Sequence, residues 1–127
     1  MMLALLALAA AHQAVPPRPI HQLRMYELYD KTRVAFHARF RDHAVRIMKR
    51  HGFVIKAMWE TRTAGKPQFI YLLEWPDETT MKARWAAFMA DAEWARIKRE
   101  TPAEHRPIVG AIEERVLVPT DYSPVLD

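Results

Sequence analysis

Apolar and polar positions repeat with two different periods along the chain, and each period predicts one kind of element. Residues 20–29 alternate at every second position, as in a strand, where successive side chains point to opposite faces. Over residues 36–51 apolar side chains recur every three or four places, so we expect an amphipathic helix that ends at Gly52. Asp30 or Thr32 is positioned to cap its start.

A hairpin and a second helical region are predicted next. Residues 53–60 and 68–75 have the character of strands, and residues 63–67 between them predict a turn longer than two residues. Pro76 and Asp77 start a second helical pattern, and Asp91 is expected to cap the start of a separate short helix.

A last strand within residues 108–118 completes the order βαββαβ. This order predicts an α+β, ferredoxin-like fold: a four-stranded antiparallel sheet with its helices on one face. Residues 53–59 and 69–73 are apolar at nearly every position, which predicts that both faces of their strands are covered. Because the chain has no further helix for the second face, we expect a second copy to cover it, forming a homodimer.

Composition and charge narrow the possible chemistry. The 127 residues include 19 Lys and Arg, 15 Asp and Glu and no Cys, with a net charge of +4. This length fits one domain, and the lack of cysteine excludes disulfides, thiol nucleophiles and iron–sulfur clusters. The basic residues of the first predicted helix have no aromatic residues interleaved with them, so nucleic-acid binding is not expected.

The first 19 residues differ in character from the rest. A nine-residue apolar run, Leu3 to Ala11, precedes three prolines, and it is too short to span a bilayer, which takes ~20 residues. Its small residues at positions 9–11 suit a signal peptidase, so residues 1–19 are expected to be a signal peptide and proline-rich spacer. We therefore predict a periplasmic or secreted protein without an integral membrane span, whose folded domain is residues 20–127. A cytoplasmic location is the alternative if the leader is not a signal.

Four segments carry a resemblance to a known family: IHQLRMYEL, FHARFRDHAVRIMKRHGF, YLLEWPDETTMKARWAAFMADAEWARIKRE and RVLVPTDYSP. Together they resemble the NIPSNAP family over residues 20–124. The resemblance implies a dimeric α+β barrel, in agreement with the dimer expected from the apolar pattern. It implies no assigned reaction, although the wider barrel superfamily includes small cofactor-free monooxygenases.

Two polar side chains are candidate catalytic residues. His43 lies beside the apolar stripe of the first predicted helix, where it could hold a ligand or act as a general base, and Tyr26 could act with it. A structural histidine at the helix–sheet boundary is the alternative. Arg24 shares a strand face with Tyr26 and could bind an anionic or carbonyl-bearing ligand. Its alternative is a buried ion pair with Glu27 or Glu114 of a partner.

The aromatic residues are candidates for the wall of a ligand pocket, with plain core packing as the alternative. Those proposed to bind ligand, together with Arg24, are Trp59, Tyr71, Trp75 and Trp85. The histidines of the first predicted helix lack the four-residue spacing of a metal pair, so no metal is expected, and no cofactor either.

The leading functional hypothesis is a homodimeric NIPSNAP-like barrel of unassigned reaction. It would bind a small hydrophobic or weakly anionic ligand or a partner protein. The alternative is a cofactor-independent monooxygenase or isomerase acting on a small aromatic or carbonyl substrate.

Overall fold

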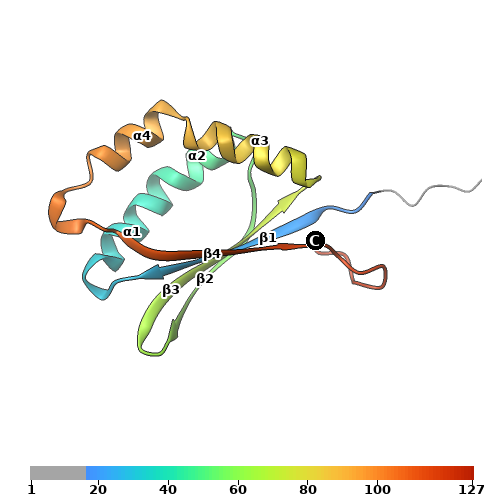
Figure 1. Ribbon diagram of the computed structural model, residues 1–127, viewed down its shortest axis with the longest axis horizontal. Coiled ribbons are helices and arrows are strands. Elements are labelled where there is room, and N and C mark those ends of the chain that lie inside the picture. Colours follow the sequence, from blue (N-terminus) through green and yellow to red (C-terminus); the bar gives the residue numbers. More distant parts are fainter. Residues whose placement is uncertain (1–16) are drawn as a thin grey trace, which may run out of the picture.

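In the computed structural model, which describes residues 17–127, four antiparallel strands form one sheet and the helices lie on one of its faces (Figure 1). The strands are β1 (Ile20–Leu28), β2 (Val54–Thr63), β3 (Lys66–Trp75) and β4 (Val109–Leu117). Their order across the sheet is β2-β3-β1-β4. The predicted ferredoxin-like arrangement is therefore confirmed.

Three helical segments cover one face of this sheet. The first consists of α1 (Arg33–Arg39), the π-helical turn η2 (Phe40–Ala44) and α2 (Val45–Arg50), preceded by the 3-10 turn η1 (Asp30–Thr32). The others are α3 (Glu78–Met89) and α4 (Ala92–Arg99), followed by the 3-10 turn η3 (Ala103–His105).

The π-helical turn has a cause in the sequence. Phe36, Phe40 and Ala44 are all buried and follow one another at steps of four residues. Because an α-helix has 3.6 residues per turn, repeated steps of four drift away from the buried face. One wider turn corrects this drift and keeps the three side chains against the sheet.

The predicted helix cap at Asp91 forms, and so does one at Asp77, but the cap predicted for the first helix does not. The Asp77 side chain accepts a hydrogen bond from the Thr80 amide at 2.7 Å, and the Asp91 side chain accepts one from the Trp94 amide at 2.9 Å. The expected cap of the first helix is wrong. The Thr32 hydroxyl instead donates to the Ile108 carbonyl at 3.2 Å, which ties the helix start to the chain before β4.

The turn between β2 and β3 is shorter than predicted. Thr63 pairs with Lys66, so only Ala64 and Gly65 form the loop. Both have positive φ, at 52° and 77°, as a type I′ hairpin turn requires. Pro67 suggested a longer loop, but β1 pairs with β3 only beyond this residue, so its missing N–H leaves no sheet hydrogen bond unmade.

Both faces of the sheet are apolar, and the described helices cover only one of them (Figure 1). On the uncovered face Leu23 pairs with Leu72, and Met25 pairs with Ile70. Trp59 pairs with Ile70 from the other side and is 50% exposed. The helix-covered face holds the core, whose largest buried side chains include Tyr71, Trp75 and Phe88.

The predicted signal peptide falls mostly on residues 1–16, which lie outside the described residues, so this assignment stays a prediction. Within residues 17–127, none of the helices has the length and apolar character needed to cross a bilayer.

Candidate functional site

A buried glutamine joins β1, β3 and α3 beneath the helices. The Gln22 side-chain oxygen accepts hydrogen bonds from the indole N–H of Trp75 at 3.0 Å and of Trp85 at 2.7 Å. Because an indole nitrogen only donates, the amide oxygen must face the tryptophans and the amide NH2 must point away. That NH2 donates to the Glu114 carboxylate on β4 at 2.9 Å. The residue is 2% exposed, and this arrangement satisfies its polar atoms.

Arg24 extends this network along β1. Its guanidinium donates to Glu114 at 2.6 Å and to the Tyr26 hydroxyl at 3.3 Å. Its Cζ also lies over the Trp85 ring, 4.4 Å from the ring centre. The Tyr26 hydroxyl lies 2.7 Å from that of Tyr71 on β3. Alternation along the strand places Gln22, Arg24 and Tyr26 on one face, so a single strand contributes three groups.

The network borders a cleft of about 440 Å³ between α3 and the β1–β4 side of the sheet. Apolar side chains and the network residues share its surface. The lining residues are Gln22, Arg24, Glu78, Met81, Lys82, Trp85, Met89, Glu114 and Val116. Arg24 Nε is buried and has no hydrogen-bond partner in the part of the chain that the structure describes.

The protonation states of the network favour hydrogen-bond donation. Burial lowers the pKa of Arg24, but its interactions with the Tyr26 and Tyr71 hydroxyls raise this pKa by more, so the guanidinium stays charged. Burial, with a further contribution from Tyr26, raises the pKa of Tyr71 far above its usual range, against the opposing effect of Arg24. The Tyr71 hydroxyl therefore keeps its proton at neutral pH and does not serve as a base.

Most of the predicted site residues belong to this network and two lie elsewhere. Arg24, Tyr26, Tyr71, Trp75 and Trp85 are joined by the contacts described above. His43 lies on η2 in another cleft, between the first helix and α4, with its Nδ1 3.3 Å from Arg46. Trp59 lies on the uncovered face of the sheet. The structure thus brings Tyr26 to Arg24 but not to His43, and the catalytic roles stay predictions.

Two network residues were not among the predicted ligand contacts. Gln22 was missed, and its only sequence signal is a glutamine on the same strand face as Arg24 and Tyr26. Glu114 was considered only as a partner of Arg24 across an interface, whereas Arg24 pairs with Glu114 of its own chain. Glu27, the other acid considered, lies 3.2 Å from Lys66.

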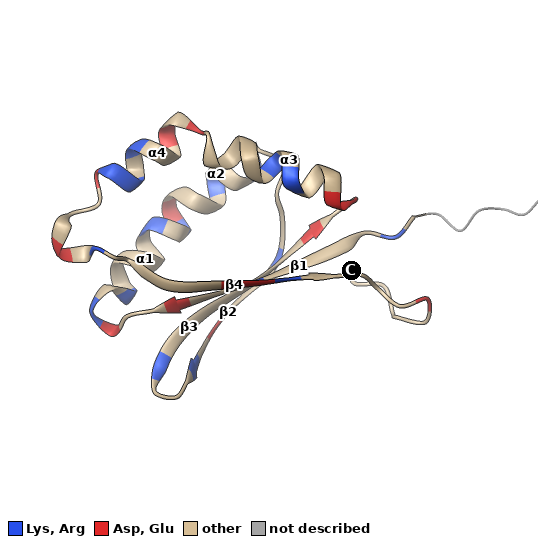
Figure 2. Ribbon diagram, viewed as in Figure 1, with Lys and Arg blue, Asp and Glu red and all other residues tan. Residues whose placement is uncertain are grey.

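Acidic residues of α4 and its cap pair with the basic residues of the first helix, and both signs of charge are spread over this layer (Figure 2). Arg46 lies 2.7 Å from Glu93. Asp91 accepts hydrogen bonds from Arg50 at 2.8 Å and from His51 at 2.7 Å, and these hold the pKa of Asp91 below its usual range. Among residues 17–127, no group of three or more histidine, aspartate or glutamate side chains is placed to hold a metal ion.

The sequence profile of the NIPSNAP family matches residues 21–124. The chain belongs to the NIPSNAP family. This NIPSNAP protein is 21% identical to an uncharacterised NIPSNAP-like domain protein from Burkholderia xenovorans, with a TM-score of 0.72 over 87% of this chain and 93% of that one. A NIPSNAP family protein of unknown function from Agrobacterium tumefaciens is 17% identical, with a TM-score of 0.72 over 87% of this chain and 96% of that one.

An enzyme is also similar in fold. SnoaB, a cofactor-independent oxygenase from Streptomyces nogalater, is 14% identical to this NIPSNAP protein, with a TM-score of 0.53 over 84% of this chain and 98% of that one. Identity this low shows a shared fold and no more, and that fold is the α+β arrangement of a four-stranded antiparallel sheet with its helices on one face, as predicted. A search of curated proteins found no match.

Proposed function

We propose that this NIPSNAP protein binds a small, largely apolar molecule through a carbonyl or carboxylate oxygen, in the cleft between α3 and β4. The Arg24 guanidinium carries the proposal, because it lines the cleft beside apolar side chains and its buried Nε has no acceptor among the described residues. An unmet buried donor is unfavourable by about 1–3 kcal/mol. A ligand oxygen would supply an acceptor, while Met81, Met89 and Val116 would contact the apolar body.

Glu114 is the internal counter-ion of this site. Its carboxylate accepts from both Arg24 and Gln22, and its side chain is 49% exposed. A ligand carboxylate would compete with Glu114 for the guanidinium. Replacement of Glu114 by glutamine removes the competing charge but keeps an acceptor oxygen, so it should strengthen the binding of anions.

The protonation states support binding over acid–base catalysis. A cofactor-independent oxygenase or isomerase needs a group that takes a proton from its substrate. Tyr71 and Arg24 both hold their protons, and the Glu114 carboxylate is engaged by two donors. The enzymatic alternative predicts oxygen uptake with a quinol substrate that is reduced in Tyr26→Phe, which an oxygen electrode would measure.

Calorimetric titration with 1-naphthoate tests the proposed binding. We expect Arg24→Met to weaken binding by at least about tenfold, since hydrogen bonds to charged groups contribute about 1.5–3 kcal/mol. Glu114→Gln should tighten it, which gives a second test that keeps the arginine. Arg115→Gln, a matched change of charge on the neighbouring position of β4, should leave it unchanged.

Three results would contradict the proposal. The first is failure of the wild-type protein to bind 1-naphthoate at millimolar concentration. The second is an equal loss of affinity in Arg24→Met and Arg115→Gln, because that pattern indicates attraction by overall charge. The third is weaker binding in Glu114→Gln. Far-UV circular dichroism of each variant establishes that the comparison is made between folded proteins.

We also infer that two copies associate through the uncovered face of the sheet. The cross-strand pairs of Leu23, Leu72, Met25 and Ile70 form an apolar surface there, with the half-exposed Trp59 beside it. Exposed apolar surfaces of this kind are typical of interaction sites. The same surface of a second copy is a self-complementary cover, as in a twofold dimer.

A further inference from the structure

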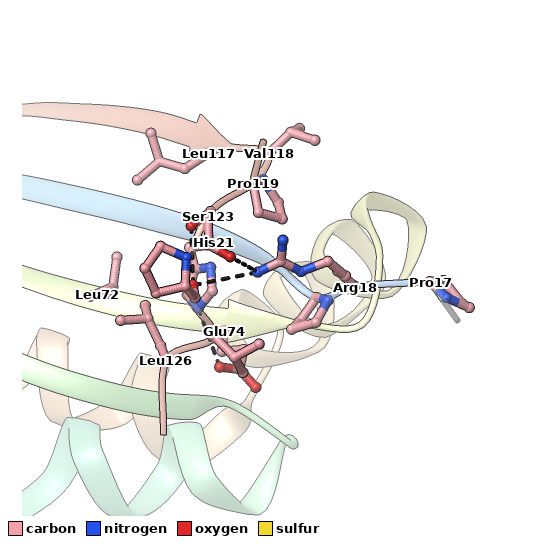
Figure 3. Close-up of a pocket in the computed structure, with 13 residues that line it drawn as sticks. Pro17, Arg18, His21, Leu72, Glu74, Leu117, Val118, Pro119, Ser123 and Leu126 are labelled. Carbon is pink, nitrogen blue, oxygen red and sulfur yellow. Dashed lines mark hydrogen bonds and ion pairs between the residues drawn. The ribbon is translucent and has the colours of Figure 1, made fainter. Parts of the chain in front are cut away.

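A second pocket lies on the uncovered face, where the C-terminal tail (residues 118–127) folds back across the sheet (Figure 3). Its volume of about 460 Å³ is in the range of small-molecule sites. His21 alternates with Gln22 along β1, so this pocket and the cleft described above lie on opposite faces. The sheet contributes His21, Leu72, Glu74 and Leu117 to the pocket, and the two chain ends contribute Pro17, Arg18, Pro19, Val118, Pro119, Ser123, Pro124, Val125 and Leu126.

One arginine holds the tail in place. The Arg18 guanidinium donates to the backbone carbonyls of Thr120 at 2.8 Å, Ser123 at 2.9 Å and Pro124 at 3.4 Å. The Ser123 amide also donates to the Thr120 carbonyl at 3.1 Å, which closes a turn in the tail. The tail is therefore fixed as one wall of the pocket, and Figure 3 shows Arg18 bonded to it from the other chain end.

The two charged residues that line the pocket differ in whether they have an ionic partner. Glu74 lies 3.2 Å from His21 and 3.6 Å from Lys56, so its carboxylate is already paired. Arg18 bonds only to uncharged carbonyls, and within residues 17–127 no carboxylate lies within ion-pair distance of it. The Arg18 guanidinium is therefore a positive charge at the pocket that has no acidic partner among residues 17–127.

The rest of the pocket is apolar and partly exposed. Leu117 is 42% exposed, and Val118, Val125 and Leu126 are more exposed still. These four side chains border the same hollow as Leu72. An apolar molecule in the pocket would remove their surface from water, which is favourable by about 25 cal/mol per Å².

We propose that this pocket binds a free aliphatic carboxylate. The hydrocarbon chain contacts the apolar residues of the sheet and tail, and the carboxylate lies near Arg18. The site is independent of the cleft at Arg24, because the two share no lining residue. It also lies at one end of the sheet, in the row of His21, Glu74 and Leu117, and it meets the apolar surface assigned to the dimer contact only at Leu72.

Calorimetric titration of the full chain with decanoate, hexanoate and decanol tests this site. We expect an increase in affinity of about fourfold for each methylene that becomes buried, so decanoate binds more tightly than hexanoate. Decanoate should also bind about tenfold more tightly than decanol, because only the acid carries a charge for Arg18. Arg18→Gln should bring the decanoate-to-decanol ratio close to one.

The ratio of decanoate affinity to decanol affinity separates a charge contact by Arg18 from a structural effect of the same residue. Release of the tail in Arg18→Gln would weaken decanoate and decanol together and leave their ratio unchanged, so that outcome contradicts a role for Arg18 in binding the carboxylate. Arg115→Gln, which removes the same charge from β4, should preserve the wild-type ratio.

Further variants and ligands establish where decanoate binds. In an Arg24→Met background, where the cleft is weakened, Arg18→Gln should still lower the decanoate-to-decanol affinity ratio; no effect of Arg18→Gln in that background would place the probe in the cleft and overturn the second site. Absence of decanoate binding to the wild type would also overturn it. Binding to phosphatidylglycerol vesicles that is lost in Arg18→Gln would indicate a membrane ligand in place of a free acid.

Discussion

Replacement of Gln22 by methionine tests whether the buried amide holds three elements of the fold together. Methionine has nearly the same length but cannot accept a hydrogen bond from an indole N–H. The change leaves the Trp75 N–H, in a side chain that is 1% exposed, without an acceptor. Trp85 is only partly buried, so its N–H can donate to water instead, and loss of its acceptor lowers the free energy of unfolding by less.

The expected size of the effect follows from these exposures. An orphaned buried donor lowers the free energy of unfolding by about 1–3 kcal/mol. Loss of the bond from Gln22 to Glu114 adds roughly 1 kcal/mol, because that carboxylate is half exposed and keeps its bond to Arg24. We therefore expect Gln22→Met to lower the free energy of unfolding by about 2–4 kcal/mol.

Urea unfolding followed by far-UV circular dichroism, at one fixed protein concentration, measures this change. In a Trp75→Phe background the orphaned donor no longer exists, so Gln22→Met should cost at least about 1 kcal/mol less there. Gln68→Met, at a more exposed position of β3, is the control and should stay within about 0.5 kcal/mol of the wild type. Additive effects of Gln22→Met and Trp75→Phe would refute the reasoning.

Three further predictions concern the turn, a helix cap and the uncovered face. Ala64→Asn should raise the free energy of unfolding by about 0.5–1 kcal/mol in urea titrations, because asparagine tolerates the left-handed conformation better than alanine does. Thr63→Asn, in extended backbone, should give no such gain. The lowered pKa of Asp91 means that its charge stabilises the fold above the ordinary carboxyl pKa and that this contribution is lost as the pH falls. Asp91→Asn keeps a cap acceptor, so wild type and variant should converge in stability between about pH 5 and pH 2; a constant difference in thermal unfolding would contradict this. Ile70→Asp should convert a dimer to monomers in sedimentation velocity, whereas Val34→Asp, on an exposed helix position, should not; a wild-type monomer at high concentration would refute the inferred association.

The fold was largely predictable because its elements follow local periods of the sequence. Alternation identified β1 and β4, continuous apolar runs identified β2 and β3, and the three-to-four spacing identified the helices, with the cap at Asp91. The hairpin turn was not predictable in the same way. Positive φ at Ala64 is a conformation that alanine rarely adopts, and nothing in the local sequence signals it.

The candidate site was predictable only where it depends on one strand. Alternation placed Arg24 and Tyr26 on one face, and the structure agrees. Gln22 shares that face, but its burial depends on Trp75 and Trp85, which come from distant elements. The pairing of Arg24 with Glu114 depends on the register between β1 and β4, which no local pattern determines.

Strand β4 forms an edge of the sheet, and the middle of this strand is charged, with Glu113, Glu114 and Arg115 in succession (Figure 2). A bare edge presents unpaired backbone groups that can recruit a strand from another molecule, which is a route to fibril growth. Antiparallel pairing of two β4 edges about their centre would bring the two glutamates of each copy close to those of the other, and their repulsion opposes such pairing. Strand β4, which supplies the counter-ion of Arg24, thus also opposes ordered aggregation through the edge of the sheet.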